Sequence, residues 1–300
     1  MKPAYLKLAE SGELERRVAG AKRRLEDCDL CARYCRMNRR ETLSGAVCRT
    51  GERAVVHGYG PHHGEEHPLR GRRGSGTIFF SWCNLRCVFC QNWDISQKGL
   101  GHEVGPEELA DMMLSLQSQG CHNINFVSPS HVVAQVIDAV AIAAQRGLAL
   151  PLVYNTGGYD SREALDLLDG IIDIYMPDMK FADPAQAHRF SHVRDYAEVN
   201  RSAVKEMHRQ VGDLELDENG VAVRGLLVRH LVLPENIAGT GEILDFLAEE
   251  ISPDTFVNIM DQYRPCYRAG EYPPLDRRLR PREFEAARVH ARQRGLHRLA

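Results

Sequence analysis

Short apolar runs alternate along the chain with longer segments in which apolar residues recur at helical spacing. The short runs predict buried strands at residues 77–80, 123–127, 152–155, 171–176, 226–233 and 256–260. The longer segments predict helices at residues 11–26, 106–119, 132–146, 162–168, 241–251 and 282–294. Six alternating units predict an α/β fold with a parallel sheet, a partial (β/α)6 TIM-like barrel. A doubly wound open sheet is the alternative.

The chain is predicted to divide into two parts. Residues 1–75 hold a helix, a small four-cysteine segment and a linker over residues 53–76 that we expect to wrap over the surface without a regular element. Residues 76–300 hold the barrel and a basic C-terminal helix. In the linker, His62, His63 and His67 with Glu65 and Glu66 could form a metal site, although a solvated polar loop is the simpler interpretation.

Length, charge and cysteine content narrow the class of protein. With 300 residues and a hydrophobic content of 43%, the chain can form one large domain or one domain with a small module. The net charge of −3 gives no indication of a nucleic-acid partner, and no stretch reaches the roughly 20 apolar residues of a membrane span. Nine cysteines without an export signal favour metal ligands over disulfides. We therefore expect a cytoplasmic protein that acts as a monomer.

Three cysteines follow the first predicted barrel strand. Cys83, Cys87 and Cys90 have the spacing C-x3-C-x2-C, which can supply three thiolates to a [4Fe–4S] cube and leave one iron open to bind another molecule. Phe89 precedes the last cysteine and could lie flat against a planar base. A zinc site or buried structural cysteines are the alternative, but no second ligand arm lies beside the triplet.

A second set of four cysteines lies in the N-terminal segment. Cys28, Cys31, Cys35 and Cys48 have the spacing C-x2-C-x3-C-x12-C in a short charged stretch that could not form a core of its own. A bound metal would stabilise such a segment because its binding free energy becomes folding free energy. Zinc and a second iron–sulfur cluster both remain open, and four closed ligands slightly favour zinc.

Polar residues follow one predicted strand after another. The carboxyl ends of parallel barrel strands meet at one edge, which is where barrel enzymes carry out their chemistry. Arg229 lies within an apolar run, on the same face as Leu227, Leu231 and Leu233. A charge inside a buried strand needs a partner. Arg229 and Lys180 therefore indicate a carboxylate ligand, and the residues at these strand ends include Ser128, Ser130, His131, Asn155, Thr156 and Asp178.

The triplet in this setting resembles the radical S-adenosylmethionine superfamily. The wider context resembles the group of pyruvate formate-lyase activating enzyme-like proteins. That likeness covers most of the chain and is carried by residues 74–81 (GSGTIFFS), 90–94 (CQNWD), 123–127 (NINFV), 153–159 (VYNTGGY), 173–180 (DIYMPDMK), 229–234 (RHLVLP) and 258–265 (NIMDQYRP).

The resemblance implies a cofactor and its ligands. Cys83, Cys87 and Cys90 would hold a [4Fe–4S] cluster, with the amino and carboxylate groups of S-adenosyl-L-methionine on the fourth iron. Phe89 would contact the adenine, and Asn92 would lie near the cofactor.

The resemblance also assigns the polar residues of the later strands. Asp178 and Lys180 match an Asp-x-Lys pair, and Arg229 matches an arginine that approaches the cofactor's carboxylate. Asn155 and Thr156 stand where the ribose is usually met.

The family's chemistry would then follow. One electron, from a donor such as flavodoxin or ferredoxin, would cleave the sulfonium to methionine and a 5′-deoxyadenosyl radical, which removes hydrogen from the substrate.

Two details set this chain apart from the family. The Gly-Gly-Glu segment that often binds the cofactor's amine is replaced by residues 127–130 (VSPS), and we propose Ser128, Ser130 and His131 as replacements. Cys266 could act as a hydrogen donor or extra ligand on the substrate side, although a small buried residue is the simpler interpretation.

Three functions are therefore open. The leading one is an enzyme that abstracts hydrogen from a peptide or small molecule. A glycyl-radical enzyme activase and a non-catalytic iron–sulfur sensor or adaptor are the alternatives. The irregular residues 53–74 and 263–279 are expected to select the substrate.

Overall fold

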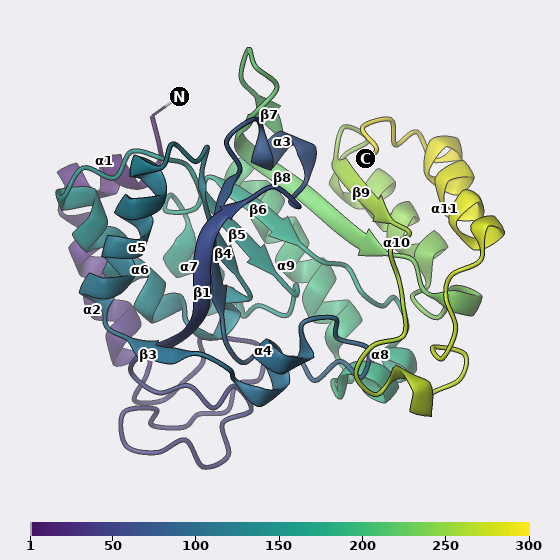
Figure 1. Ribbon diagram of the computed structural model, residues 1–300, viewed down its shortest axis with the longest axis horizontal. Helices are drawn as coiled ribbons and strands as arrows, with labels where there is room; N and C mark the ends of the chain where they lie inside the picture. Colours follow the sequence, from purple (N-terminus) through teal and green to yellow (C-terminus); the bar gives the residue numbers. More distant parts are fainter. Residues whose placement is uncertain (1) are drawn as a thin grey trace.

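One sheet of nine strands forms the centre of the computed structural model, which describes residues 2–300. Neighbouring strands follow the order β3 (His102–Val104), β1 (Ala54–His62), β2, β4, β5, β6 and β8, and both β7 (Glu215–Leu216) and β9 pair with β8. Six strands are parallel: β2 (Ser75–Phe80), β4 (Ile124–Val127), β5 (Leu152–Thr156), β6 (Ile174–Pro177), β8 (Ala222–Leu231) and β9 (Phe256–Met260). Each overlaps a strand predicted from the sequence, and the α/β partial barrel is confirmed (Figure 1).

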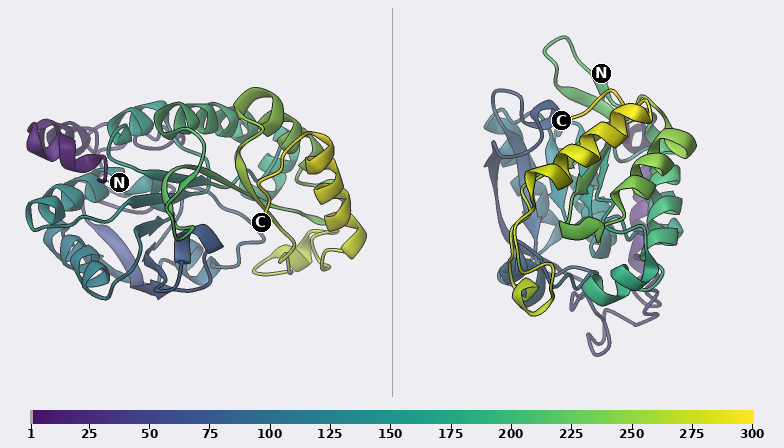
Figure 2. Two further views of the ribbon diagram at one scale, coloured as in Figure 1. Left: turned by 90° about the horizontal axis from the view of Figure 1, so that it is seen from above. Right: turned by 90° about the vertical axis from the view of Figure 1, so that its right-hand side faces the viewer.

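Helices cover the outer face of the curved sheet (Figure 2). They are α5 (Pro106–Ser118), α6 (Val133–Gln145), α7 (Arg162–Leu168), α9 (Tyr196–Val211) and α10 (Thr240–Phe246), which continues in a π-helical turn at Leu247–Ile251. The N-terminal α1 (Tyr5–Glu10) and α2 (Glu13–Arg23) pack on α6, and α11 (Pro281–Gln293) packs on α10. Across residues 2–300, no helix is both long and apolar enough to cross a bilayer.

Shorter elements lie mostly in the connections between strands. They are α3 (His67–Arg70), α4 (Trp93–Lys98), α8 (Pro184–Ser191) and single 3₁₀ turns at Pro129–His131, Pro234–Asn236 and Ala269–Glu271. The predicted helices are confirmed, but α1, α4, α8 and α9 were not predicted. The signal for α9 is present in the sequence, since Tyr196, Val199, Ala203 and Met207 recur at helical spacing.

The expectation of a linker without a regular element was wrong for two stretches. Residues Ala54–His62 form β1, which pairs antiparallel with β2 and, at its start, with β3 (His102–Val104), and residues His67–Arg70 form α3. Gly58, Gly60 and Pro61 are typical of loops, so the sequence does not indicate a strand at β1. Proline is tolerated there because this half of β1 is an edge, where β3 no longer pairs. Backbone pairing to β2, rather than a buried side-chain face, defines the strand.

The inner face of the sheet is divided between an apolar base and a polar upper part. Val153, Ile174, Met176 and Leu227 form a buried cluster with Leu69 of α3. Farther along the same strands, inward side chains become polar. Because successive residues of a strand face opposite sides, Asn155 and Arg229 point the same way as the apolar residues two positions before them. The apolar cluster therefore closes one end of the barrel and leaves the other end for a site.

Candidate functional site

The loop after β2 carries Cys83, Cys87 and Cys90 to the C-terminal edge of the sheet. It is tied to α8, where Val88 N donates to Phe190 O (2.9 Å). The three side chains line one cavity of about 260 Å³, and among residues 2–300 no other cysteine lines it. Three thiols without a fourth protein thiol match a [4Fe–4S] cluster with one open iron, so the donor set fits that group.

The three thiols are held in an apolar setting. Burial raises the pKa of Cys83 to about 12. It also raises the pKa of Cys87 and of Cys90, an effect that the nearby charge of Lys180 opposes. Cys83, Cys87 and Cys90 would therefore each have to lose a proton to hold iron. Their sulfur contacts are Leu85 N to Cys83 (3.4 Å), Ser191 Oγ with Cys87 (2.9 Å) and Ser96 Oγ with Cys90 (3.1 Å).

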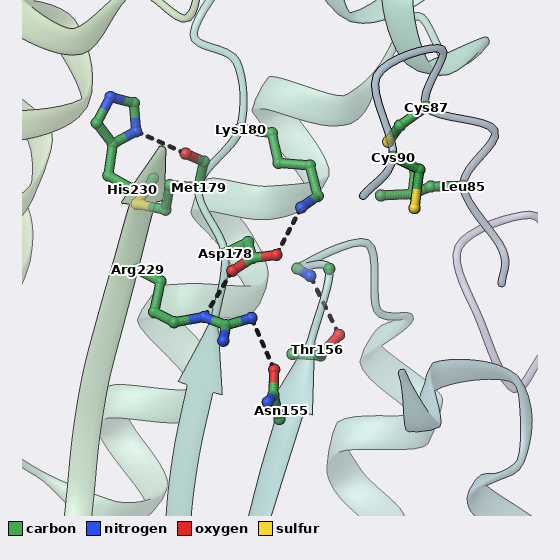
Figure 3. A network of polar contacts seen from close by, with 12 residues as sticks. Leu85, Cys87, Cys90, Asn155, Thr156, Asp178, Met179, Lys180, Arg229 and His230 are labelled. Carbon is green, nitrogen blue, oxygen red and sulfur yellow. Dashed lines mark hydrogen bonds and ion pairs between the residues drawn. The ribbon is translucent and has the colours of Figure 1, made fainter. Parts of the chain in front are cut away.

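A chain of charged side chains crosses the cavity wall beside the thiols. Lys180 Nζ donates to Asp178 Oδ2 (2.5 Å), and Arg229 Nε donates to Asp178 Oδ1 (2.8 Å). Arg229 Nη2 also donates to Asn155 Oδ1 (2.8 Å). Figure 3 shows Asp178 between the two cations, with Cys87 on the neighbouring loop. These contacts join the ends of β5, β6 and β8. Arg229 and Leu231 line the same cavity, which confirms that the two side chains lie on one face of β8.

Asp178 is ionised in this setting. Burial opposes its charge, but Arg229 and Lys180 together outweigh burial and hold the pKa of the Asp178 carboxyl below its ordinary value. Burial likewise opposes the charge of Lys180, and Asp178 and Cys87 raise its pKa above the ordinary value. Asp178 is therefore held between two cations, and both cations line the cavity beside the thiols.

The loops at the strand ends approach closely. Gly158 has a φ of +73°, and a Cβ there would collide with the Asp178 carbonyl oxygen. The loop after β5 thus packs directly on the start of the loop after β6, which carries Lys180. Glycine is needed at this position for both its conformation and its size.

Other predicted cofactor residues lie along the same cavity. Phe89 packs edge to face with Phe181 (centroids 6.0 Å apart) and lies 6.3 Å from the Tyr263 ring. Asn92, at the start of α4, and Asn155 line the cavity as well.

Thr156 also lines the cavity, but its hydroxyl is already engaged. It donates to Asp160 Oδ2 (2.6 Å) and lies 2.8 Å from Ser130 Oγ. Its side chain is therefore fixed by neighbours in the protein.

The three residues predicted to bind the cofactor's amine are not brought together. Ser128 lines the cavity, with a left-handed φ of 58°. Ser130 is buried on Thr156, and His131 Nε2 contacts Ser81 O (3.0 Å). Burial lowers the pKa of His131 to about 3, so this imidazole is neutral. Of the three, the geometry therefore leaves only Ser128 at the cavity wall.

Cys266 does not line the cavity. It lies half-buried in the loop after β9, where its carbonyl accepts from Ala269 N (3.0 Å). The geometry gives no support for a role on the substrate side.

Two carboxylates of the predicted polar loop lie beside the thiol cavity. Glu65 and Glu66 line a second cavity of about 560 Å³ that adjoins the first and shares Asn92, Asn155 and Arg229 with it. In the sequence, the signal that could have indicated this position is the pair of adjacent glutamates after a glycine-rich stretch. Of the five residues considered as a possible metal site in this stretch, His62, Glu65 and Glu66 line the second cavity, whereas His63 and His67 do not.

The four N-terminal cysteines lie together in a segment of turns. Cys28, Cys31 and Cys48 are buried and Cys35 is half-buried. The buried Arg39 donates from Nη1 to Cys28 Sγ (3.5 Å). A hydrogen bond from Cys35 is the main cause that lowers the pKa of Cys28, to about 5. The segment thus places the Cys28 thiol beside a guanidinium, and metal binding by the four cysteines stays a prediction.

Comparison with known proteins gives a family match. The model of the radical SAM superfamily matches residues 77–247. An uncharacterized protein of Methanocaldococcus jannaschii, MJ0674, is 33% identical over 284 residues, which cover 91% of this chain and 77% of that protein.

Solved structures with similar folds are much more distant in sequence. SuiB from Streptococcus suis bound to S-adenosylmethionine has a TM-score of 0.48 at 13% identity and covers 73% of this chain. A radical SAM methyltransferase from Sphaerobacter thermophilus has a TM-score of 0.48 at 12% identity, over 75% of this chain and 65% of that one. The chain spans about half the length of SuiB, 48%.

Replacing Asp178 with asparagine should destabilise the protein in a pH-dependent way. Because the folded-state pKa is lowered, the ionised carboxylate stabilises the fold above the unfolded pKa of about 3.9, and the contribution is lost as pH falls through the folded pKa. We expect Asp178→Asn to lower the free energy of unfolding by about 2 kcal/mol at neutral pH, with the difference shrinking below about pH 4. Urea unfolding, monitored by circular dichroism at neutral and acidic pH, measures the loss of free energy of unfolding and its pH dependence.

Asp111→Asn is the matched control. Asp111 pairs with Arg146 at 2.6 Å, but its side chain is 60% exposed. Its replacement should change the free energy of unfolding by less than about 0.5 kcal/mol. A loss for Asp178→Asn that stays constant down to about pH 3 would contradict the assigned ionisation.

Proposed function

The chain belongs to the radical SAM superfamily, and we propose that it is an enzyme that reductively cleaves S-adenosyl-L-methionine and abstracts hydrogen from a small molecule or peptide. One observation carries this proposal. The three thiols share a cavity with the chain Lys180–Asp178–Arg229 at the carboxyl ends of the parallel strands. Three soft ligands for iron thus lie beside two cations suited to a carboxylate.

The protein's part is to hold the cluster and S-adenosyl-L-methionine, to orient them and to shield them from water. A [4Fe–4S] cluster with S-adenosyl-L-methionine supplies, when bound, the electron transfer that cleaves the sulfonium and the 5′-deoxyadenosyl radical that takes hydrogen. Cys83, Cys87 and Cys90 would hold the cluster. Lys180 and Arg229 would bind the cofactor's carboxylate, because both cations line the cavity that the three thiols share.

Other side chains complete the cavity. Phe89 would offer an aromatic face to the adenine, while Asn155 and Thr156 would lie along the ribose. Leu231 and Leu233 form part of the wall and would keep water from a reactive radical.

Activation of a glycyl-radical partner is the second candidate. Residues 173–180 and 229–234 resemble the pyruvate formate-lyase activating enzyme-like group, and the adjoining cavity of about 560 Å³ would give a peptide segment room beside the cofactor. An electron donor such as flavodoxin or ferredoxin belongs to either function. We further propose that the enzyme acts as a cytoplasmic monomer.

Removing one cluster ligand should abolish the reaction. We expect Cys87→Ala to lose the cluster's visible absorption and to form no 5′-deoxyadenosine above background, because three thiolates are the whole protein ligand set. The measurement is anaerobic reconstitution with iron and sulfide, followed by dithionite, S-adenosyl-L-methionine and chromatography. Cys121→Ala, a buried cysteine outside the cavity, should retain both signals.

Two results would count against this function. Cleavage of the cofactor by Cys87→Ala would contradict the ligand assignment. An intact cluster in the wild-type protein without any 5′-deoxyadenosine would favour a non-catalytic iron–sulfur sensor or adaptor.

Removing the lysine should weaken cofactor binding. A charge-assisted hydrogen bond contributes about 1.5–3 kcal/mol, so Lys180→Ala should raise the Kd of S-adenosyl-L-methionine roughly 10- to 100-fold. Equilibrium dialysis with the oxidised holoenzyme, which does not turn over, measures the Kd. Lys205→Ala is the control because that side chain is 50% exposed and pairs with Glu250. An unchanged Kd for Lys180→Ala would refute the carboxylate site.

The N-terminal cysteines should retain a metal of their own. We propose a structural zinc ion, supported by four thiols in a segment without a helix or strand from residue 24 to residue 53. In a variant with alanine at Cys83, Cys87 and Cys90, we expect about one zinc per chain by metal analysis, without labile sulfide. Residual iron with sulfide would instead mean a second cluster, and no metal would contradict a metal site.

A further inference from the structure

The second cavity is acidic and joins the first. His62, Glu65 and Glu66 enter it from the end of β1 and the turn that follows, and Asn258 enters it from β9. At about 560 Å³ it has room for a small molecule. Asn92, Asn155 and Arg229 border both cavities, so a molecule bound here would lie directly beside the cofactor cavity.

One carboxylate oxygen of Glu66 lacks a hydrogen-bond donor inside this cavity. Its side chain is only 5% exposed. Oε1 accepts from Asn258 Nδ2 (3.0 Å), while Arg229 Nη1 stays 3.8 Å away. Oε2 is buried and has no partner. A buried carboxylate oxygen left without a donor costs about 1–3 kcal/mol or more, so this atom points to a ligand that brings a donor.

Glu65 adds a second carboxylate at the same place. Its side chain is 7% exposed, and its Oε1 lies 3.0 Å from His62 Nδ1. Burial raises the pKa of the Glu65 carboxyl, and the charge of Glu66 raises it further, although Arg229 opposes both. A cation placed between the two glutamates would offset this repulsion.

The charges nearby do not neutralise the pair. Arg229 already donates hydrogen bonds from Nε to Asp178 and from Nη2 to Asn155. Lys180 pairs with Asp178 at the thiol side. The two cations therefore meet three carboxylates, those of Asp178, Glu65 and Glu66.

The position of the pair separates it from the cofactor's own amine. Starting at the thiols, contacts run from Lys180 through Asp178 and Arg229 to Glu66, so the glutamates lie at the far end of the chain. An amine bound to the cluster's iron would lie at the near end.

We propose that this cavity binds the primary ammonium group of the substrate, a small aliphatic amine, between Glu65 and Glu66. The inference rests on the proposed function, since it takes the neighbouring cavity to hold the cofactor. It assigns residues after β1 to substrate selection and names the chemical class of the substrate.

The test measures binding without turnover. Oxidised holoenzyme saturated with S-adenosyl-L-methionine is titrated calorimetrically with n-pentylammonium and with its neutral counterpart, 1-pentanol. We expect the ammonium to bind at least about tenfold more tightly than the alcohol, as one charge-assisted hydrogen bond predicts. Glu66→Gln should remove most of that advantage. Glu218→Gln, which makes the same change on an exposed turn, should keep it.

Several outcomes would overturn the inference. Equal affinity for ammonium and alcohol in the wild-type holoenzyme does so without any variant, and Glu65→Gln gives a second variant if Glu66→Gln fails to retain its cluster. Ammonium binding that disappears when S-adenosyl-L-methionine is added would assign the pocket to the cofactor's amine instead. Formation of 5′-deoxyadenosine is measured separately, so wild-type protein that forms it without distinguishing the two probes would lose only this inference.

Discussion

The ionised Asp178 between Lys180 and Arg229 is the interaction on which the site depends. These side chains come from the ends of β6 and β8, and Arg229 extends the contacts to Asn155 at the end of β5. A partly buried carboxylate that lost either cation would leave an uncompensated charge in a low-dielectric wall. The three strand ends are therefore held in one geometry, and the thiol loop faces that geometry from the end of β2.

The alternation of side chains along each strand gives the site its depth. Val153 and Leu227 face the barrel interior and close its base, while Asn155 and Arg229, two positions farther on, line the cavity above them. The outward residues of the same strands pack on the helices. A strand can therefore carry a charge inward because its apolar neighbours stabilise both the base and the outer face.

Local signals in the chain were enough to predict much of this protein. Six parallel strands, the triplet on the loop after the first, and the inward direction of Arg229 follow from spacing and period alone. The strand β1 could not be predicted in this way, because its glycines and Pro61 read as a loop and only pairing with β2 makes it a strand. The burial of Ser130 against Thr156 could not be predicted, because it depends on the 3₁₀ turn that follows β4.

By itself, the sequence determined the chemistry that the site can hold: three thiols at C-x3-C-x2-C spacing and an Asp-x-Lys pair, both local in the chain. Only the tertiary structure decided which residues from distant parts of the chain lie across the cavity from them. Glu66 and Asn258 lie 192 positions apart and meet at 3.0 Å because the turn after β1 reaches across to β9. Contacts between such distant residues depend on how the sheet curves, and curvature is set by the packing of the whole sheet rather than by any short stretch of residues.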